Sequence, residues 1–264
     1  IDVSKQVAVF TNDATKWILD NLYFLTVGFK DFISYAVLNP LETLLAGSPW
    51  YVTVGMVVAI ALIISELRIA VLALVLAMLI VISGLWYESM ITLTQTIVGT
   101  LLTMFVGIAL GIWTGRNERI ERLLRPFLDA GQTLPAFVYL VPMLGLFGPT
   151  RFTAIATGIV YAIPIVVKIV GEGIRSVPYS QVEAAMAAGS TTRQIISKVQ
   201  LPAAKRTMLL AVNQGLIYVL AVVVIGGFVG AGGLGYLVIV GNSKPELQGK
   251  GLIAGLCILL LGVI

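Results

Sequence analysis

The feature that most constrains this chain is the length of its intervals without an ionisable side chain. Seven intervals contain no Asp, Glu, Lys or Arg, and they cover residues 50–65, 69–87, 89–115, 130–150, 152–167, 207–242 and 251–264. A helix that crosses a membrane needs about 20 predominantly apolar residues, because lipid neither solvates charges nor hydrogen-bonds the backbone. The pattern therefore predicts an all-α membrane protein with about seven transmembrane helices.

The composition excludes most classes of soluble protein and enzyme. Of the 264 residues, 58% are hydrophobic and 11% are charged, whereas globular domains contain roughly 25% charged residues. The chain has no His and one Cys, so it cannot form an internal disulfide, a His-based catalytic dyad or a Cys/His zinc site. The spans also lack a carboxylate that could serve an intramembrane enzyme as a base. We expect no enzymatic activity, no metal site and no nucleic-acid partner.

The basic residues are distributed unevenly between the two sides of the membrane if the spans alternate in direction. One side receives 11 of the 17 Lys and Arg residues, and the other side receives six. Those on the first side are Arg68, Arg116, Arg119, Arg122, Arg125, Lys168, Arg175, Arg193, Lys198, Lys205 and Arg206. Because cytoplasmic loops are enriched in Lys and Arg, we expect a multi-pass protein of a bacterial-type inner membrane, with its N-terminus outside.

Residues 1–49 differ from the rest because they mix charged and apolar side chains. Apolar residues recur at helical spacing in this segment, and they are Trp17, Ile18, Leu22, Leu25, Phe29 and Phe32. The charged residues lie mostly away from this stripe, which favours an amphipathic helix on the outer membrane surface. The alternative is a helix that packs against the spans. Residues 50–264 would then form the transmembrane domain.

The longest polar stretch, residues 171–206, is predicted to form two short helices. Pro178 interrupts the preceding helix, and Ser180 with Glu183 has the spacing of a capping box, in which the two side chains satisfy free backbone N–H groups. Gly189 then has the place of a glycine that ends a helix with a positive φ angle. These signals predict a first helix between Ser180 and Gly189.

The second short helix should begin at another capping box, formed by Thr191 and Gln194, and end at Leu201-Pro202. Each helix carries an apolar stripe, made of Val182, Ala185, Met186 and Gly189 on the first and of Ile195, Ile196 and Val199 on the second. Basic residues flank both stripes. Two small helices with exposed apolar stripes on the cytoplasmic side are typical of a docking surface.

At these residues the chain resembles a known family. Glu183-Ala184-Ala185, Gly189 and Leu201-Pro202 are similar to the EAA motif of the membrane subunits of ABC importers. Four further stretches resemble the permeases of the glycine betaine/proline subgroup: FLDAGQTLPAFVYLVPMLGLFG (127–148), KVQLPAA (198–204), VNQG (212–215) and GAGGLG (230–235). The likeness extends from about residue 50 to the end of the chain.

The resemblance implies a type I ABC importer transmembrane fold and ATP-driven uptake of glycine betaine or a related compatible solute. Loop 171–206 would couple the permease domain to ATPase subunits through the six residues of the EAA motif, which are Glu183, Ala184, Ala185, Gly189, Leu201 and Pro202. The other implied partners are a second permease copy and an external substrate-binding protein or fused binding domain. Because the chain has no nucleotide-binding motif, ATP and Mg would bind to the partner ATPase.

Several uncharged polar residues and prolines lie in or near the apolar spans. The candidates for a translocation pathway are Gln132, Pro135, Tyr139, Asn213 and Gln214. Dipoles and aromatic faces suit a zwitterion, because they interact with a quaternary ammonium group without holding it tightly. The alternative for the polar residues is hydrogen bonding between helices, and for the proline a helix kink that serves only helix packing.

Two further patterns leave alternatives open. Glu118 with Arg122, and Glu121 with Arg125, have the i,i+4 spacing of helical ion pairs, on a helix end that contacts anionic lipid or the ATPase. The glycine-rich stretch 224–237 lacks the Lys-Ser/Thr of a phosphate loop and predicts a break between helices at the outer surface. The competing function is an ion-coupled secondary transporter or channel, but such coupling generally uses intramembrane acids, and the spans contain none.

Overall fold

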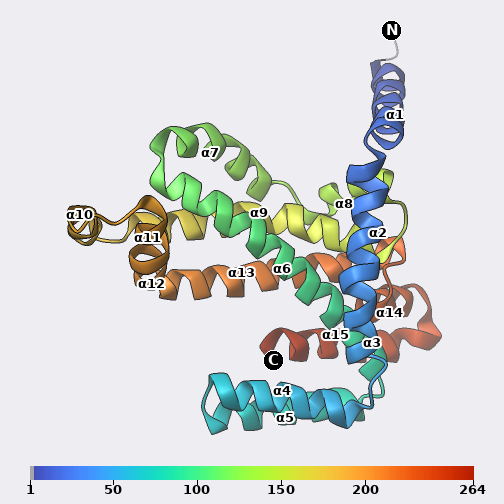
Figure 1. The fold of residues 1–264 in the computed structure, drawn as a ribbon. Coiled ribbons are helices and arrows are strands. Elements are labelled where there is room, and N and C mark those ends of the chain that lie inside the picture. Colours follow the sequence, from blue (N-terminus) through green and yellow to red (C-terminus); the bar gives the residue numbers. More distant parts are fainter. Residues whose placement is uncertain (1–2) are drawn as a thin grey trace. The chain divides into compact units, whose positions relative to one another are not determined.

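The computed structural model describes residues 3–264, which contain helices, turns and no β-strand (Figure 1). The described residues form two compact units. Unit 1 contains the residues up to 98 together with 137–157 and 222–264, and unit 2 contains 99–136 and 158–221. The predicted all-α class is confirmed.

The N-terminal segment is helical along almost its whole length. It comprises helix α1 (Val3–Asn21), the π-helical turn η1 (Phe24–Gly28), helix α2 (Phe29–Ile33), the π-helical turn η2 (Ser34–Leu38) and helix α3 (Asn39–Leu45). The regular spacing of apolar residues in the sequence therefore does reflect a helix.

The two ends of this segment differ in burial. Trp17 and Phe32 expose 60% and 64% of their surface, whereas Ile33, Leu38 and Leu45 are buried in unit 1. The last part of the segment is thus packed within unit 1, as in the alternative, whereas Trp17 and Phe32 of the predicted stripe are exposed and Ile18 is half-buried. Residues 1–2 and the side chain of Leu25 lie outside the described part of the chain, and the external location of residues 1–49 stays a prediction.

Within residues 3–264, four helices are long and apolar enough to cross a membrane, as judged from their length and composition. They are α6 (Trp86–Arg116), α9 (Arg151–Arg175), α13 (Lys205–Ile225), which continues into the 3-10 turn η4 (Gly226–Val229), and α15 (Gln248–Val263), which follows the 3-10 turn η5 (Pro245–Leu247). Counting two bent helix pairs as single spans raises the number to six.

The bent pairs and the shorter helices account for the remaining apolar intervals. Residues Thr26–Leu45 meet α4 (Trp50–Ile64) at 104°, and α7 (Glu118–Thr133) meets α8 (Ala136–Phe147) at 101°. Helices α5 (Leu67–Ile82) and α14 (Gly233–Ser243) are apolar but short. Each of the seven predicted intervals therefore contains a helix, but only four to six satisfy the length of a span. Interval 207–242 divides into α13 and α14 because the glycine-rich stretch interrupts it, as predicted.

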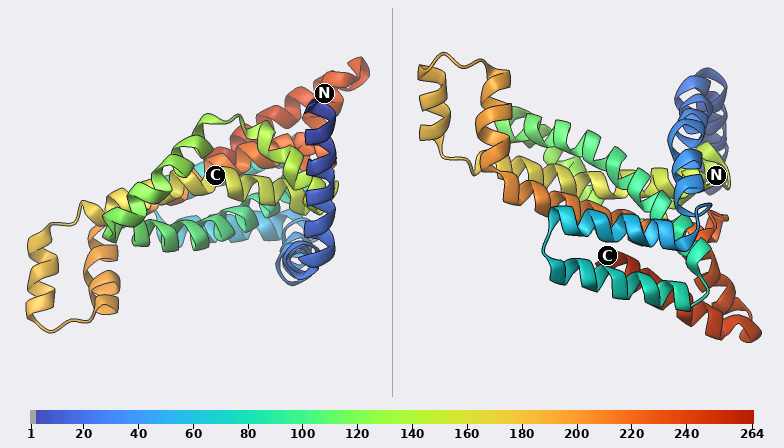
Figure 2. Two further views of the ribbon diagram at one scale, coloured as in Figure 1. Left: turned by 90° about the horizontal axis from the view of Figure 1, so that it is seen from above. Right: turned by 60° about the horizontal axis from the view of Figure 1, so that its bottom comes forward.

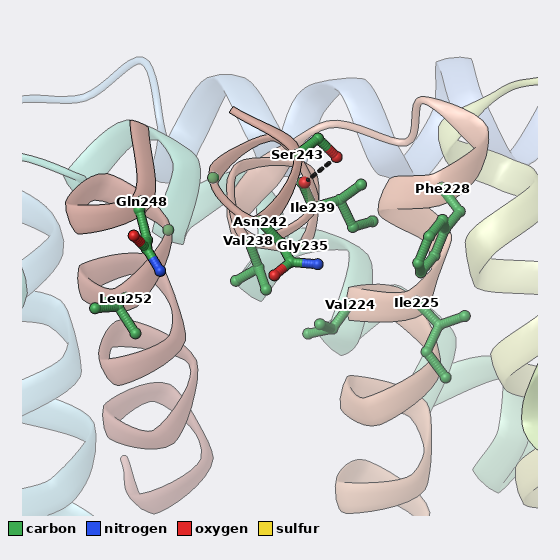
Figure 3. Close-up of a pocket in the computed structure, with 12 residues that line it drawn as sticks. Val224, Ile225, Phe228, Gly235, Val238, Ile239, Asn242, Ser243, Gln248 and Leu252 are labelled. Atoms are coloured by element: carbon green, nitrogen blue, oxygen red, sulfur yellow. Dashed lines mark hydrogen bonds between the residues drawn. The ribbon is translucent and has the colours of Figure 1, made fainter. Parts of the chain in front are cut away.

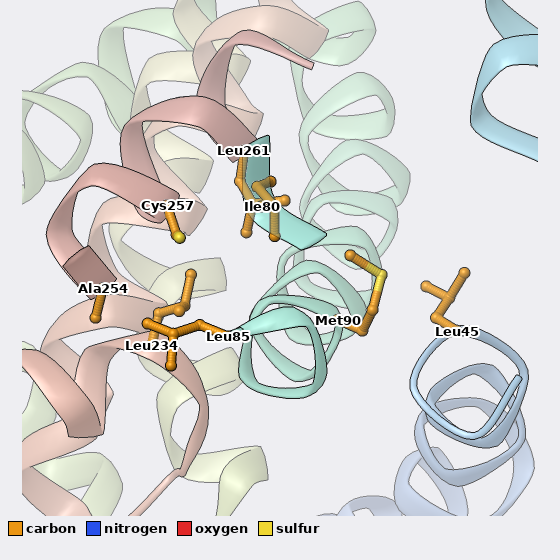
Figure 4. Close-up of a cluster of buried hydrophobic side chains, with 8 residues drawn as sticks. All are labelled: Leu45, Ile80, Leu85, Met90, Leu234, Ala254, Cys257 and Leu261. Atoms are coloured by element: carbon orange, nitrogen blue, oxygen red, sulfur yellow. The ribbon is translucent and has the colours of Figure 1, made fainter. Parts of the chain in front are cut away.

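The core of unit 1 joins helices from distant parts of the sequence (Figure 4). Its buried side chains are Leu45, Ile80, Leu85, Met90, Leu234, Ala254, Cys257 and Leu261. Helices α4 and α5 run side by side as a hairpin (Figure 2), and α14 lies against α15. That last contact is close because glycines meet there: a Cβ added at Gly241 would lie 2.6 Å from the Cα of Gly251.

The core of unit 2 depends on glycines that are four residues apart in α6. A Cβ at Gly111 would lie 2.5 Å from the Cβ of Val170 in α9, and a Cβ at Gly115 would lie 2.7 Å from the carbonyl oxygen of Gly171. Residues four apart share one face of a helix, and small residues there let two membrane helices approach closely. The buried residues beside this contact are Met104, Val166, Val170, Ile174 and Ala211.

Candidate functional site: a helical hairpin and a polar strip in unit 2

A helical hairpin lies between the two long helices α9 and α13. It consists of α10 (Tyr179–Ala187) and a second helical segment built from α11 (Thr192–Ile195), the π-helical turn η3 (Ile196–Gln200) and α12 (Leu201–Ala203). The two halves lie side by side beyond the ends of α9 and α13 (Figures 1 and 2). The predicted pair of short helices is confirmed, and the second helix extends to Ala203, just past the predicted end.

The predicted capping box at the start of α10 is wrong. Pro178 is the N-cap residue, and no side chain forms a capping hydrogen bond there. Ser180 is therefore the second residue inside the helix, where its backbone is already helical and its hydroxyl cannot act as an N-cap. Proline has the extended backbone that a helix start needs, so the boundary falls two residues earlier than the Ser180–Glu183 spacing suggested. Glu183 is left exposed and is not needed for capping.

The end of α10 agrees with the prediction. Gly189 has a φ angle of +77°, a conformation that disfavours residues with a Cβ. The amide of Gly189 donates to the carbonyl of Met186 at 2.9 Å, and the amide of Ser190 donates to the carbonyl of Ala185 at 3.0 Å. These two bonds form a Schellman motif, which ends the helix and satisfies its last carbonyl groups.

The second helix begins as predicted. The hydroxyl of Thr191 accepts from the amide of Gln194, and the side chain of Gln194 accepts from the amide of Thr191 at 2.8 Å. At the base of the hairpin, the guanidinium of Arg116 in α6 donates to the Oε1 of Gln200, a side chain that is only 7% exposed. The hairpin is thus ordered at both helix ends and is bonded to α6.

The two apolar stripes of the hairpin differ in exposure. Helix α10 has no buried residue. On its surface Val182 and Ala185 are half-buried, and Met186 is 46% exposed. On the second helix, Ile195 is only 3% exposed and Ile196 and Val199 are half-buried, so the expectation of an exposed stripe is wrong for Ile195. Of the two halves of the hairpin, α10 therefore has the more exposed surface.

The six residues of the EAA motif are distributed over this hairpin. Glu183 and Ala184 are exposed on α10, Ala185 is half-buried there, and Gly189 follows the helix end. Leu201 and Pro202 lie on α12, in the neighbouring half of the hairpin. The motif therefore joins a free helix to the helix that supports it, and a role of these residues in coupling stays a prediction.

Ion pairs join α7 to α9 at one side of unit 2. The ammonium of Lys168 in α9 contacts the carboxylate of Asp129 at 2.5 Å and donates to the Oε1 of Gln132 at 2.7 Å. Arg175 contacts Glu121 at 2.6 Å. The hydrogen bond from Lys168 lowers the pKa of Asp129, which precedes the apolar interval 130–150. Asp129 therefore remains ionised at neutral pH.

The predicted i,i+4 ion pairs within α7 are wrong. Glu121 pairs with Arg175 in α9 instead of Arg125 in its own helix, and Arg122 donates to the backbone carbonyl of Glu118 at 3.4 Å rather than to its carboxylate. The charges on this face of α7 interact with α9 because α7 packs against that helix. Their spacing alone could not distinguish contacts within the helix from contacts between helices.

A cavity of about 590 Å³ adjoins these ion pairs, and all its walls belong to unit 2. Lys168 and Glu172 line it from α9, Asp129 from α7, and Thr207 from α13. The Nε2 of Gln132, which hydrogen-bonds Lys168 through its other side-chain atom, is buried without a hydrogen-bond partner among the described residues. No group of three His, Cys, Asp or Glu in the described chain could hold a metal ion. Charged side chains of both signs therefore line this cavity.

The five predicted pathway residues are distributed over α7, α8, α13 and the break between α7 and α8, and their role in a pathway stays a prediction. Gln132 lies in α7, and Asn213 and Gln214 lie in α13, with Asn213 exposed and Gln214 half-buried. Pro135 lies at the break between α7 and α8 rather than inside a helix, so it separates two helices instead of kinking one. Tyr139 is half-buried in α8, in unit 1.

An aromatic pair in unit 2 was not predicted from the sequence. The rings of Tyr161 in α9 and Tyr218 in α13 have centroids 5.4 Å apart and planes inclined by 31°. Both side chains are half-buried. One signal in the sequence could have pointed to Tyr218. It lies four residues after Gln214, so the two polar side chains share one face of α13.

A second cavity, of about 380 Å³, lies in unit 1 between the end of α13 and helices α14 and α15 (Figure 3). Its walls are mostly apolar, and the amides of Asn242 and Gln248 are its main polar groups. The loop before α14 is held by α6, where Gln95 donates to the carbonyl of Ala231 at 2.8 Å and Thr92 accepts from an amide of α14. None of these residues was among the predicted sites.

The comparisons with known proteins agree with this architecture. Residues 107–264 match the family described as "Binding-protein-dependent transport system inner membrane component". Two chains from structures of the inward-facing MetNI methionine ABC transporter have TM-scores of 0.59 and 0.58, at 24% and 25% identity, and cover 67% and 66% of this chain and 90% and 88% of their own. The fold is thus that of a type I ABC importer permease.

Curated relatives are permease proteins. The glycine betaine/proline betaine permease ProW of Escherichia coli is 34% identical over 97% of this chain and 72% of its own length. The glycine betaine/carnitine permease GbuB of Listeria monocytogenes is 37% identical over 68% and 63%, and the trimethylamine N-oxide permease TmoV of Pelagibacter ubique is 31% identical over 97% and 36%. The chain therefore spans from about a third to about three-quarters of these relatives. It belongs to the family of inner membrane components of binding-protein-dependent transport systems.

Proposed function

We propose that this chain is the membrane-spanning subunit of an ATP-driven importer for glycine betaine or a related methylated compatible solute. The relatives that suggest this substrate class carry glycine betaine, carnitine or trimethylamine N-oxide in their names. An external binding protein or fused binding domain delivers the solute, and a second permease copy completes the pathway.

The observation that carries the proposal is the free surface of α10. A helix of nine residues is too short to be stable alone in water, yet α10 buries no residue of its own. It is kept in shape by the Schellman motif at Gly189 and by its contact with the second half of the hairpin. A preformed, unpartnered helix between the two long spans suits docking to another subunit. The partner is an ATPase, which binds ATP and Mg.

The distribution of basic residues indicates on which side of the membrane the hairpin meets the ATPase. Exposed Arg193, Lys198 and Lys205 lie on or next to the hairpin, and cytoplasmic segments are enriched in such residues. The hairpin therefore faces the cytoplasm, where ATP is available. The N-terminus and the glycine-rich break between α13 and α14 lie on the outer side.

The test is transport by the complete importer, reconstituted in vesicles with its ATPase and binding protein. Uptake of labelled glycine betaine should require ATP inside the compartment that holds the ATPase, and it should continue when an ionophore removes ion gradients. Excess trimethylamine N-oxide or carnitine should compete, and sugars should not. Uptake that stops with the ionophore while ATP is present would instead support an ion-coupled transporter.

A further inference from the structure

Two strips of polar side chains run along facing helices of unit 2. On α9, Tyr161, Lys168 and Glu172 follow the spacing i, i+7 and i+11. With 3.6 residues per turn, these positions point within about 20° of one direction. One face of α9 thus carries Tyr161 at the aromatic pair and Lys168 and Glu172 at the cavity beside Asp129.

Helix α13 repeats this spacing with Thr207, Gln214 and Tyr218. A Cβ at Gly173 of α9 would lie 2.9 Å from the Cβ of Thr207, which places the two helices in contact near the hairpin. Tyr161 and Tyr218 make the second contact, nearer the other end. The two strips therefore run beside each other from the cavity to the aromatic pair.

The location of the polar groups argues against a lipid-facing surface. Asn213 is exposed and Gln214 is half-buried, although both lie within an apolar helix that is long enough to span a membrane. An amide that loses its water without gaining a hydrogen bond costs free energy, and polar residues within membrane spans generally face a water-filled cavity or the interior of a bundle. Asn213 and Gln214 are therefore unsuited to contact with lipid, and they suit a water-filled cavity or the interior of a helix bundle.

We infer that the Tyr161–Tyr218 pair is a transit site for the methylated ammonium group of the transported solute, in a pathway lined by the polar strips of α9 and α13. This inference rests on the proposed function. Tyrosine rings attract a cation through their negative faces when it lies within about 6 Å of the ring centroid. Both residues are partly exposed, as a site that a moving solute contacts must be.

The spacing also limits what one solute can contact. Tyr161 and Lys168 are seven residues apart, which separates them by about 10 Å along the helix axis. The ammonium of Lys168 already contacts the carboxylate of Asp129 and the Oε1 of Gln132, so it is not free to hold the carboxylate of a solute whose ammonium lies at the tyrosines. The tyrosines therefore contact the methylated ammonium end of the solute only.

The experiment changes the charge distribution of one ring while keeping its shape. In the complete reconstituted importer, Tyr218 is replaced by Phe, by a trifluorinated phenylalanine or by Leu, and the same is done at Tyr161. The maximal rate of glycine betaine uptake is measured at saturating binding protein. Tyr236→Leu, which alters an exposed tyrosine of α14 in unit 1, serves as the matched control.

We expect Tyr218→Phe to stay within about twofold of the wild-type rate, because the ring keeps its negative face. The fluorinated ring and Tyr218→Leu should lower the rate by about 2- to 30-fold, the range that corresponds to one cation–π contact, while the affinity of the binding protein and the amount of assembled importer stay constant. Equal rates for Phe and fluorinated Phe would overturn the inference. A loss that appears only in a Leu variant with reduced assembly would do the same, since it indicates structural support alone.

The outcomes separate this inference from the proposed function. If the wild-type importer takes up glycine betaine with ATP and the fluorinated variants match their Phe counterparts, only the transit site is wrong. If the wild-type importer transports no methylated ammonium solute, both the proposed function and the transit site are wrong.

Discussion

The helix end at Gly189 allows a quantitative prediction for substitutions at that residue. Its φ angle of +77° belongs to the left-handed region, which costs a residue with a Cβ about 1–2 kcal/mol. A Cβ added at Gly189 would meet no atom within 4 Å, so the cost is conformational rather than steric. Gly189→Val should therefore weaken the Schellman motif by about 1–2 kcal/mol. Gly189→Asn should have a small effect, because asparagine tolerates this conformation.

The assay for Gly189 is backbone hydrogen exchange at the two amides that close the motif. The amides of Gly189 and Ser190 donate to carbonyls of α10, and a loss of 1–2 kcal/mol should accelerate local opening about 5- to 30-fold. In the Val variant the amide of Ser190 reports this change directly, and coupling of ATP hydrolysis to uptake should fall with it. Exchange at Ser190 that is equally slow in the Val and Asn variants would refute the argument.

Three further predictions concern other parts of the chain. Glu183→Gln should leave the helicity of α10 unchanged, since Glu183 forms no cap, but should uncouple ATP hydrolysis from uptake; normal coupled transport would show that this carboxylate is dispensable. Gly111→Ala should lower the thermal midpoint by the equivalent of about 1–3 kcal/mol, because its Cβ collides with α9. Gly55→Ala, which has open space around it, should not, and equal midpoints would contradict the close-packing account. Lys168→Gln should raise the pKa of Asp129, whose hydrogen bond to Lys168 now lowers it, so an unchanged carboxyl titration by NMR would rule out that cause.

Local signals in the sequence predicted much of the fold. The charge-free intervals located the four long apolar helices α6, α9, α13 and α15, because charge is excluded from lipid regardless of how the helices pack. Likewise Gly189 and the Thr191–Gln194 box were predictable, since both depend on backbone groups a few residues away. The start of α10 was misplaced because two local signals competed there and the extended backbone of Pro178 determined the boundary.

Contacts between distant segments could not be predicted in this way. The i,i+4 spacing of Glu121 and Arg125 fits an ion pair within α7, but Arg175 of α9 lies nearer in space and pairs with Glu121 instead. Ile195 was expected on an exposed stripe, and only the packing of the hairpin base shows that it is buried. The tyrosine pair was missed for the same reason, because 57 residues separate Tyr161 from Tyr218. Pairing across helices is a property of tertiary structure that helical periodicity does not contain.

The most direct test of the central claim is a crosslink from α10 to the ATPase. Met186 is 46% exposed on α10, and the chain's own Cys257 is buried, so Met186→Cys introduces one reactive thiol. A short bifunctional maleimide should join this thiol to an ATPase subunit carrying a cysteine in its docking cleft, and the same reagent should give no product with Leu256→Cys, which is 56% exposed on α15. A crosslink from Leu256→Cys with none from Met186→Cys would contradict the account of α10 as the coupling surface.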